Sequence, residues 1–168
     1  MDVYDAVTTV LAVREYRPDP VPDDVLHRIV EAGRLTASAM NRQPWSFVVV
    51  RDRATIDQIG EIVTTGSYLV QAPVVIVVAV ERSKFGLSDA SRAIQSMLLT
   101  AWSEGVGSNW TGGPGMDALK PLLGIPDELD VVAAIPFGYP AHPGGAGKKN
   151  RKPLGEVAHA ERFGTPLE

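Results

Sequence analysis

Three runs of apolar residues have the length and composition of buried β-strands. Residues 72–80 contain no polar side chain, which predicts a strand covered on both faces. Residues 45–50 are mostly aromatic and β-branched and predict a second strand. Residues 130–138 form a third long apolar run. We expect these three segments to contribute the central strands of the fold.

Helical periodicity fills much of the remaining chain. Residues 23–32 predict an amphipathic helix, because two acids occupy the first turn and the apolar residues share one face. These apolar residues are Val25, Leu26, Ile29 and Val30. Further helices are predicted at residues 2–11, at residues 53–63 after a capping Asp52, and before Gly124, which is a typical C-terminal cap.

A longer helix is predicted at residues 88–104, with Ser88 as its N-cap. Between Ala93 and Ser103 it carries no charge, and apolar side chains spread around most of its circumference. Such a helix must be buried on nearly every side, and a single sheet covers one side. Either another helix or a partner subunit must cover the rest. A central helix of a monomeric α/β domain is the alternative.

The connection at residues 36–45 gathers small, amide and aromatic side chains between a predicted helix and a predicted strand. Small residues at 37–39 allow a ligand to approach the backbone, and Asn41 and Gln43 supply directed hydrogen bonds. The alternative is an ordinary loop with a proline-terminated turn.

Length, charge and residue content exclude several classes of function. A chain of 168 residues predicts one domain, at residues 1–168. The net charge of −4 argues against nucleic-acid binding, and the absence of cysteine excludes disulfides and thiolate chemistry. The three histidines are scattered without ligand spacing, so no metal site is expected. Without a signal peptide or an apolar run of membrane-spanning length, we expect a cytoplasmic protein that does not contact a membrane.

The sequence Ser38-x-x-Asn41-x-Gln43-Pro44-Trp45, preceded by an Arg-x-Tyr-x-x-x-Pro run at residues 14–20, resembles the nitroreductase family of flavin enzymes. The likeness extends from about residue 4 to residue 157. It implies an α+β fold in which helices flank a central mixed or antiparallel sheet. It also implies an intertwined homodimer with one FMN per site at the interface. The C-terminal arm, residues 141–168, is expected to cross to the partner.

The resemblance also implies the residues of the site. The amides of Gly112 and Gly113 are expected to hold flavin N5 and O4 as the catalytic contacts, with Trp110 nearby. The remaining expected FMN contacts are Leu11, Ala12, Arg14, Ala37, Ser38, Ala39, Asn41, Lys149 and Arg151. The family's usual Arg-Arg-Ser-x-Arg sequence is altered, because Val10 and Ala12 replace the first arginine and the serine. Two phosphate-end contacts are therefore missing.

Each of these residues has a plainer interpretation. Arg14 could be a surface cation that pairs with Glu15 or Asp19. The glycine-rich segment at 105–114 could end a strand in a bulge and a turn. The basic segment that contains Lys148, Lys149 and Arg151 has the composition of a solvated tail.

The function that the resemblance implies is an FMN-dependent NAD(P)H oxidoreductase that reduces nitroaromatic, quinone or similar small acceptors by hydride transfer through flavin N5. The alternative is a flavin- or deazaflavin-binding protein without turnover, with weakened phosphate-end contacts. The segment between Val80 and Ser88 is too short for a helical lid, which predicts an open pocket and a broadly chosen acceptor.

Overall fold

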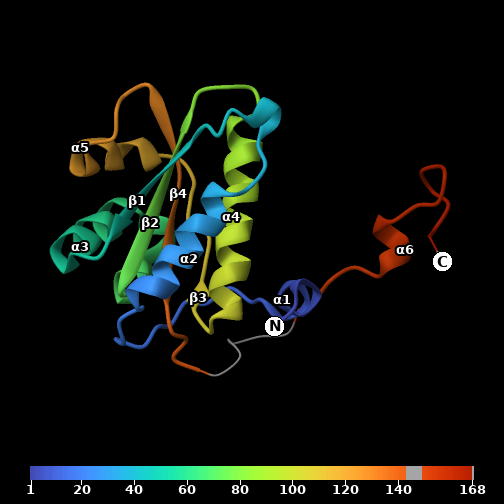
Figure 1. Cartoon of the computed structure of the whole chain (residues 1–168), viewed down its shortest axis with the longest axis horizontal. Helices are drawn as coiled ribbons and strands as arrows, with labels where there is room; N and C mark the ends of the chain where they lie inside the picture. Colours follow the sequence, from blue (N-terminus) through green and yellow to red (C-terminus); the bar gives the residue numbers. More distant parts are fainter. Residues whose placement is uncertain (143–148, 168) are drawn as a thin grey trace.

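The computed structural model describes residues 1–142 and 149–167. Residues 143–148 of the predicted arm, including Lys148, and Glu168 lie outside the described residues. The fold is α+β, with a four-stranded antiparallel sheet in the order β1-β2-β4-β3 (Figure 1). Its strands are β1 (Trp45–Val50), β2 (Val74–Glu81), β3 (Gly107–Ser108) and β4 (Leu129–Gly138).

The central strand β2 separates two apolar clusters. Its side chains alternate between them with the period of two that a pleated strand imposes. Val74, Ile76, Val78 and Val80 enter one cluster, and Val75, Val77 and Ala79 enter the other. All seven are buried, which confirms the prediction of a strand covered on both faces.

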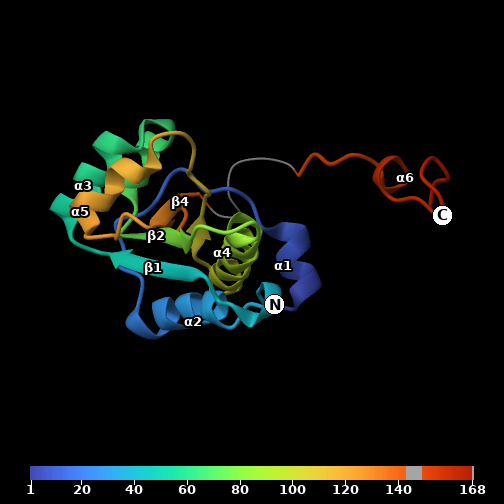
Figure 2. The same ribbon diagram turned by 90° about the horizontal axis from the view of Figure 1, so that it is seen from above.

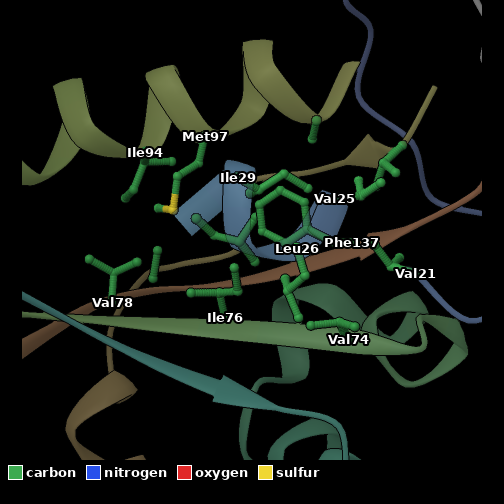
Figure 3. Close-up of a cluster of buried hydrophobic side chains, with 14 of the residues drawn as sticks. Val21, Val25, Leu26, Ile29, Val74, Ile76, Val78, Ile94, Met97 and Phe137 are labelled. Carbon is green, nitrogen blue, oxygen red and sulfur yellow. The ribbon is translucent and has the colours of Figure 1, made fainter. Parts of the chain in front are cut away.

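Helices cover both faces of the sheet (Figures 1 and 2). The helices α2 (Asp23–Arg34) and α4 (Gly86–Ser103) lie on one face. The helices α3 (Arg53–Ile62) and α5 (Leu119–Leu123) lie on the other. Figure 3 shows Phe137 between the first pair of helices and the sheet, near Ile29 and Met97. Burial of each such side chain contributes about 1.5–3 kcal/mol.

Helix ends test the capping predictions. Asp52 caps α3 by accepting a hydrogen bond from the Thr55 amide, and Gly124 ends α5 at a φ of 64°, as predicted. The Ser88 prediction is wrong, because α4 begins earlier, at Gly86. A Cβ at Gly86 would lie 2.7 Å from the Glu81 carbonyl oxygen, so glycine lets the helix start directly against the end of β2.

Residues 11–17 join the edge of the sheet. Val13 donates its amide hydrogen to the Ser108 carbonyl at 2.9 Å, and Ala12 forms a parallel bridge with Ser108. Tyr16 forms an antiparallel bridge with Pro140. These isolated bridges place the segment beside β3 and the end of β4.

The remaining elements are short. They are α1 (Val3–Thr9), α6 (Leu154–Val157) and the 3₁₀ turns η1 (Ala39–Asn41), η2 (Thr64–Gln71) and η3 (Met116–Ala118). Residues 149–167 extend away from the sheet and its helices (Figures 1 and 2). Among the described residues, every helix is too short or too polar to cross a bilayer.

Candidate functional site

The loop at residues 37–43 has a strained backbone. Met40, Asn41 and Gln43 have φ angles of 53°, 53° and 51°, in the left-handed region that favours glycine. For a residue with a side chain this conformation costs about 1–2 kcal/mol, and less for asparagine. Strain of this kind persists where the surrounding structure determines the conformation, and it is frequent in binding sites.

Hydrogen bonds within the loop fix its shape. The Gln43 amide donates to Ser38 Oγ at 2.8 Å, and the Asn41 amide donates to the Ser38 carbonyl at 3.0 Å. The Gln43 side-chain amide donates to the Asn41 carbonyl at 3.2 Å. As an acceptor in this arrangement, the Ser38 hydroxyl keeps its own hydrogen for a ligand. Asn41 and Ala37 are exposed, whereas Ser38 and Ala39 are half-buried.

A buried carboxylate attaches this loop to α4. Asp89 is 1% exposed, and the Ala39 amide approaches its two carboxylate oxygens at 3.1 and 3.3 Å. The Arg92 guanidinium forms an ion pair with the same carboxylate. Sequence reasoning missed this contact, since an acid in the first turn of a helix is explained by the helix dipole and needs no tertiary partner.

The N-terminal segment is fixed by packing against β3. A Cβ on Gly107 would lie 2.5 Å from a methyl carbon of Val13, so the absence of a side chain at 107 allows the two backbones to approach. Tyr16 is buried and donates its hydroxyl hydrogen to the Val13 carbonyl at 2.7 Å. This burial raises the pKa of Tyr16 above its ordinary value, with the nearby Tyr68 adding to the effect.

Arg14 projects from this segment toward η2. Its guanidinium carbon lies 5.9 Å from the ring centroid of Tyr68, within the range of a cation–π contact. The two acids considered as its partners have other contacts, since Arg17 pairs with Asp19 and the His142 ring nitrogen lies 3.0 Å from a Glu15 carboxylate oxygen. The Asn109 side chain donates to the Tyr68 hydroxyl. Sequence reasoning missed Tyr68 and Asn109, which are far apart in the chain.

The glycine-rich turn lies along β4. Thr111 is buried and bonded to Ala134, whose amide donates to the Thr111 carbonyl at 2.9 Å. Gly112 packs so that a Cβ would lie 2.9 Å from both the Val132 carbonyl oxygen and Trp110 Nε1. Gly113 has a φ of 141°, and the position of its missing Cβ is open. The backbone is therefore anchored at Thr111 and accessible at Gly113.

Two cations predicted to clamp a phosphate are in the described part of the arm. The Lys149 ammonium donates to the Val7 carbonyl near the end of α1, four residues before Leu11. Desolvation and the neighbouring Arg151 lower the pKa of Lys149. Arg151 is exposed and donates to the Asn150 carbonyl at 2.9 Å.

Comparison with known proteins identifies the family. The sequence profile of the Nitroreductase family matches residues 11–67 and 63–139. The chain belongs to the nitroreductase family. It is 35% identical over 150 residues to a protein of Methanothermobacter thermautotrophicus that is described provisionally as an NADH dehydrogenase/NAD(P)H nitroreductase, with 84% of this chain and 78% of the relative covered.

Two further relatives extend the comparison. The FMN reductase [NAD(P)H] of Bacillus subtilis is 25% identical over 187 residues, with 96% of this chain and 74% of that protein covered. A crystal structure from Bacteroides thetaiotaomicron, described provisionally as an NADH dehydrogenase/NAD(P)H nitroreductase, superposes with a TM-score of 0.87. It is 29% identical and covers 95% of this chain and 97% of its own.

The expected site residues of this nitroreductase-family chain fall into two separate groups. Arg14 and the segment that contains Trp110, Gly112 and Gly113 lie at the β3–β4 edge of the sheet. The 37–43 loop contacts α4 near its first turn, through Asp89. Trp102, in the last turn of α4, contacts Thr9 of the N-terminal region instead. The stretch of helix from Asp89 to Trp102 spans about 20 Å.

Proposed function

We propose that this nitroreductase-family chain, an FMN-dependent oxidoreductase that takes electrons from NAD(P)H, reduces nitroaromatic, quinone or similar small acceptors at a site shared by two copies of the chain. The names of its relatives support the cofactor and the electron donor. One observation carries the shared site: in a single chain, the 37–43 loop contacts the first turn of α4, whereas the Arg14 segment pairs with β3, which follows the last turn of α4.

A two-fold dimer brings these groups together. When two copies of a helix pack antiparallel about a two-fold axis, the first turns of one copy meet the last turns of the other. The 37–43 loop of one subunit then faces the Arg14 segment of its partner, and two equivalent sites result. Each site is incomplete in one chain.

Exposed apolar side chains on α1 and on the C-terminal arm support contact with a partner subunit. Val3 and Tyr4 on α1 are 78% and 77% exposed, and Phe163 on the arm is 94% exposed. Leu154 and Val157 of α6 are exposed as well. Exposed apolar groups gathered on one element are typical of interaction surfaces. The arm is therefore proposed to cross to the partner subunit.

The residues present suit FMN. The open position at Gly113 and the small side chains at 37–39 allow a flat ring to approach the backbone, whose N–H groups donate hydrogen bonds. Lys149 and Arg151 offer charge-assisted hydrogen bonds to a phosphate. Val10 and Ala12 offer no such bonds, so the clamp depends on the arm.

When bound, FMN would supply the redox chemistry, namely hydride acceptance from the nicotinamide and electron transfer to the acceptor. The role of the protein is to bind FMN and to orient it. In the proposal, the amides of Gly112 and Gly113 donate to N5 and O4, and Ser38 and Asn41 hold the ring edge and ribityl chain. The permanent charge of Arg14 stabilises negative charge on the reduced ring.

The pocket is proposed to be open. Only residues 82–85 connect β2 to α4, so this part of the chain contains no helical lid. A pocket without a lid selects acceptors by their redox chemistry and planarity more than by shape. The open pocket therefore supports the reduction of several kinds of small acceptor.

Anaerobic titration of the purified protein with NADH and with NADPH tests the function. We expect a yellow protein whose flavin absorbance is bleached by one or both nicotinamides and restored by a nitroaromatic or a quinone. A flavin that binds but is never bleached would support the alternative of binding without turnover. A protein that binds no FMN at all contradicts both.

A further inference from the structure

We propose that Asp89 is a positioning residue for the cofactor site: its buried carboxylate holds the 37–43 loop in the conformation that meets the flavin. This inference rests on the two-subunit FMN site proposed above. It assigns a role to a residue outside the set predicted from sequence, and the contact between Asp89 and Ala39 carries it.

The burial of Asp89 calls for a specific explanation. A carboxylate that is 1% exposed has lost its water, and this loss is unfavourable unless nearby donors replace the water. Two donors do so: the Ala39 amide, which lies within 3.1 and 3.3 Å of the two oxygens, and the Arg92 guanidinium. Arg92 belongs to the same helix, so the Ala39 contact is the one that reaches another segment.

This contact acts at the strained part of the loop. Ala39 begins η1 and directly precedes Met40 and Asn41, which have left-handed φ angles. The bonds between Ser38 and Gln43 fix the internal shape of the loop but not its place on the protein. A hydrogen bond from the Thr36 hydroxyl to the Ser96 hydroxyl, at 2.8 Å, links the chain to α4 ahead of the strained residues. Asp89 provides a second contact with α4, directly before the strained residues.

The chemistry of the carboxylate suits this role. An N–H that donates to a charged oxygen forms a stronger hydrogen bond than one that donates to a neutral acceptor. Asp89 also stands on a long helix whose apolar side is packed in the core, so its position is rigid. The plainer alternative is that Asp89 only stabilises the start of α4 through the helix dipole.

Three variants of the full-length protein separate these roles. Asp89→Ala removes the acceptor, Asp89→Asn keeps an oxygen that can accept from Ala39, and Asp57→Asn changes an exposed carboxylate that pairs with Arg53 on α3. Loss of a charge-assisted hydrogen bond predicts an FMN dissociation constant raised about 10- to 100-fold in Asp89→Ala. Asp89→Asn, which keeps a neutral acceptor, is expected to recover part of the affinity, and Asp57→Asn to match the wild type.

The shape of the loop is measured without cofactor, by amide hydrogen exchange of the apo protein. We expect faster exchange at Asn41 and Gln43 in Asp89→Ala than in Asp89→Asn, with the amides of Ile94 and Met97 in α4 unchanged. Faster exchange in α4 with an unchanged loop would assign Asp89 to helix stability alone and overturn the proposal. An Asp89→Asn variant that binds FMN as weakly as Asp89→Ala would also overturn it.

The same contact can be removed from the loop side, which covers the case that Asp89→Ala does not fold. Ala39→Pro deletes the donor while the Asp89–Arg92 pair stays, and proline suits the first position of a helical turn. The extended backbone of Ser38, with a ψ of 162°, is compatible with a following proline. A similar loss of FMN affinity is expected, and wild-type affinity in Ala39→Pro contradicts the role of this bond. If the wild type binds no FMN, the proposed function fails instead.

Discussion

The two ends of α4 hold the expected site residues by different physical means. Near the first turn, the 37–43 loop depends on a few directed hydrogen bonds, above all the one from Ala39 to Asp89. Beyond the last turn, the N-terminal segment depends on sheet pairing to Ser108 and on close packing of Val13 against Gly107. Substitutions at the first end are therefore expected to change FMN affinity, and those at the second to change the stability of the whole fold.

The largest effect is expected from Gly107→Ala. The added methyl would lie 2.5 to 3.0 Å from three carbons of the Val13 side chain, and a buried β-branched neighbour has little room to move. Overpacking of this kind lowers the free energy of unfolding by about 1–3 kcal/mol. Urea denaturation measures this loss in the free energy of unfolding. In the double variant with Val13→Ala, the two losses should fall short of additive, because the methyl enters the vacated space. An unchanged urea midpoint in Gly107→Ala would contradict the packing described here.

The second-largest effect is expected from Tyr16, whose contribution to the free energy of unfolding depends on pH. Burial raises the pKa of its hydroxyl in the folded state above the ordinary value of 10.0. Below that value the phenol is neutral in both states, and its contribution to stability is complete. Above it the unfolded tyrosine ionises first, so stability falls by about 1.4 kcal/mol per pH unit.

Tyr16→Phe is the matched control. It is expected to cost about 0.5–1.5 kcal/mol at neutral pH through loss of the bond to Val13. Its stability should then decline less steeply than that of the wild type at high pH, in urea titrations on both sides of the ordinary tyrosine pKa. Parallel slopes for the two proteins would contradict a buried, neutral Tyr16.

The smallest effect is expected at the other end of α4, in the strained loop. Met40 has a φ of 53° and an exposed side chain, so its replacement changes backbone strain without removing packing. Met40→Gly is expected to raise the free energy of unfolding by up to about 1 kcal/mol, and Met40→Val, whose β-branched side chain fits this backbone less well, to lower it by less than about 1 kcal/mol. Thermal unfolding of the two variants compares them. Equal shifts would show that the left-handed backbone stores no strain.

Much of the fold could be predicted because it depends on local patterns. The uninterrupted apolar run of β2 predicted burial on both faces, and Gly124 predicted a left-handed helix end. The start of α4 was predicted wrongly, since Ser88 has the chemistry of a cap but the close approach of Gly86 to Glu81 decides the first turn. That approach is a tertiary contact, which periodicity does not report.

The expected site residues came from resemblance, and their roles stay predictions. The structure shows that Arg14 and the glycine-rich turn share one edge of the sheet, and that Ser38 and Asn41 lie in a strained loop. Asp89 and Tyr68 escaped sequence reasoning. Their partners, Ala39 and Asn109, are 50 and 41 residues away in the chain, and no local pattern pairs them.

The central claim is that each site needs both chains, and complementation between two variants tests it most directly. Arg14→Ala impairs one group of contacts, and Asn41→Gly impairs the other while keeping a backbone that favours left-handed φ. Each homodimer should reduce a nitroaromatic poorly. Mixed dimers, made by co-expression or subunit exchange, should contain one intact site and restore about a quarter of wild-type activity across a random mixture. Activity no higher than the mean of the two homodimers would contradict a site shared between subunits.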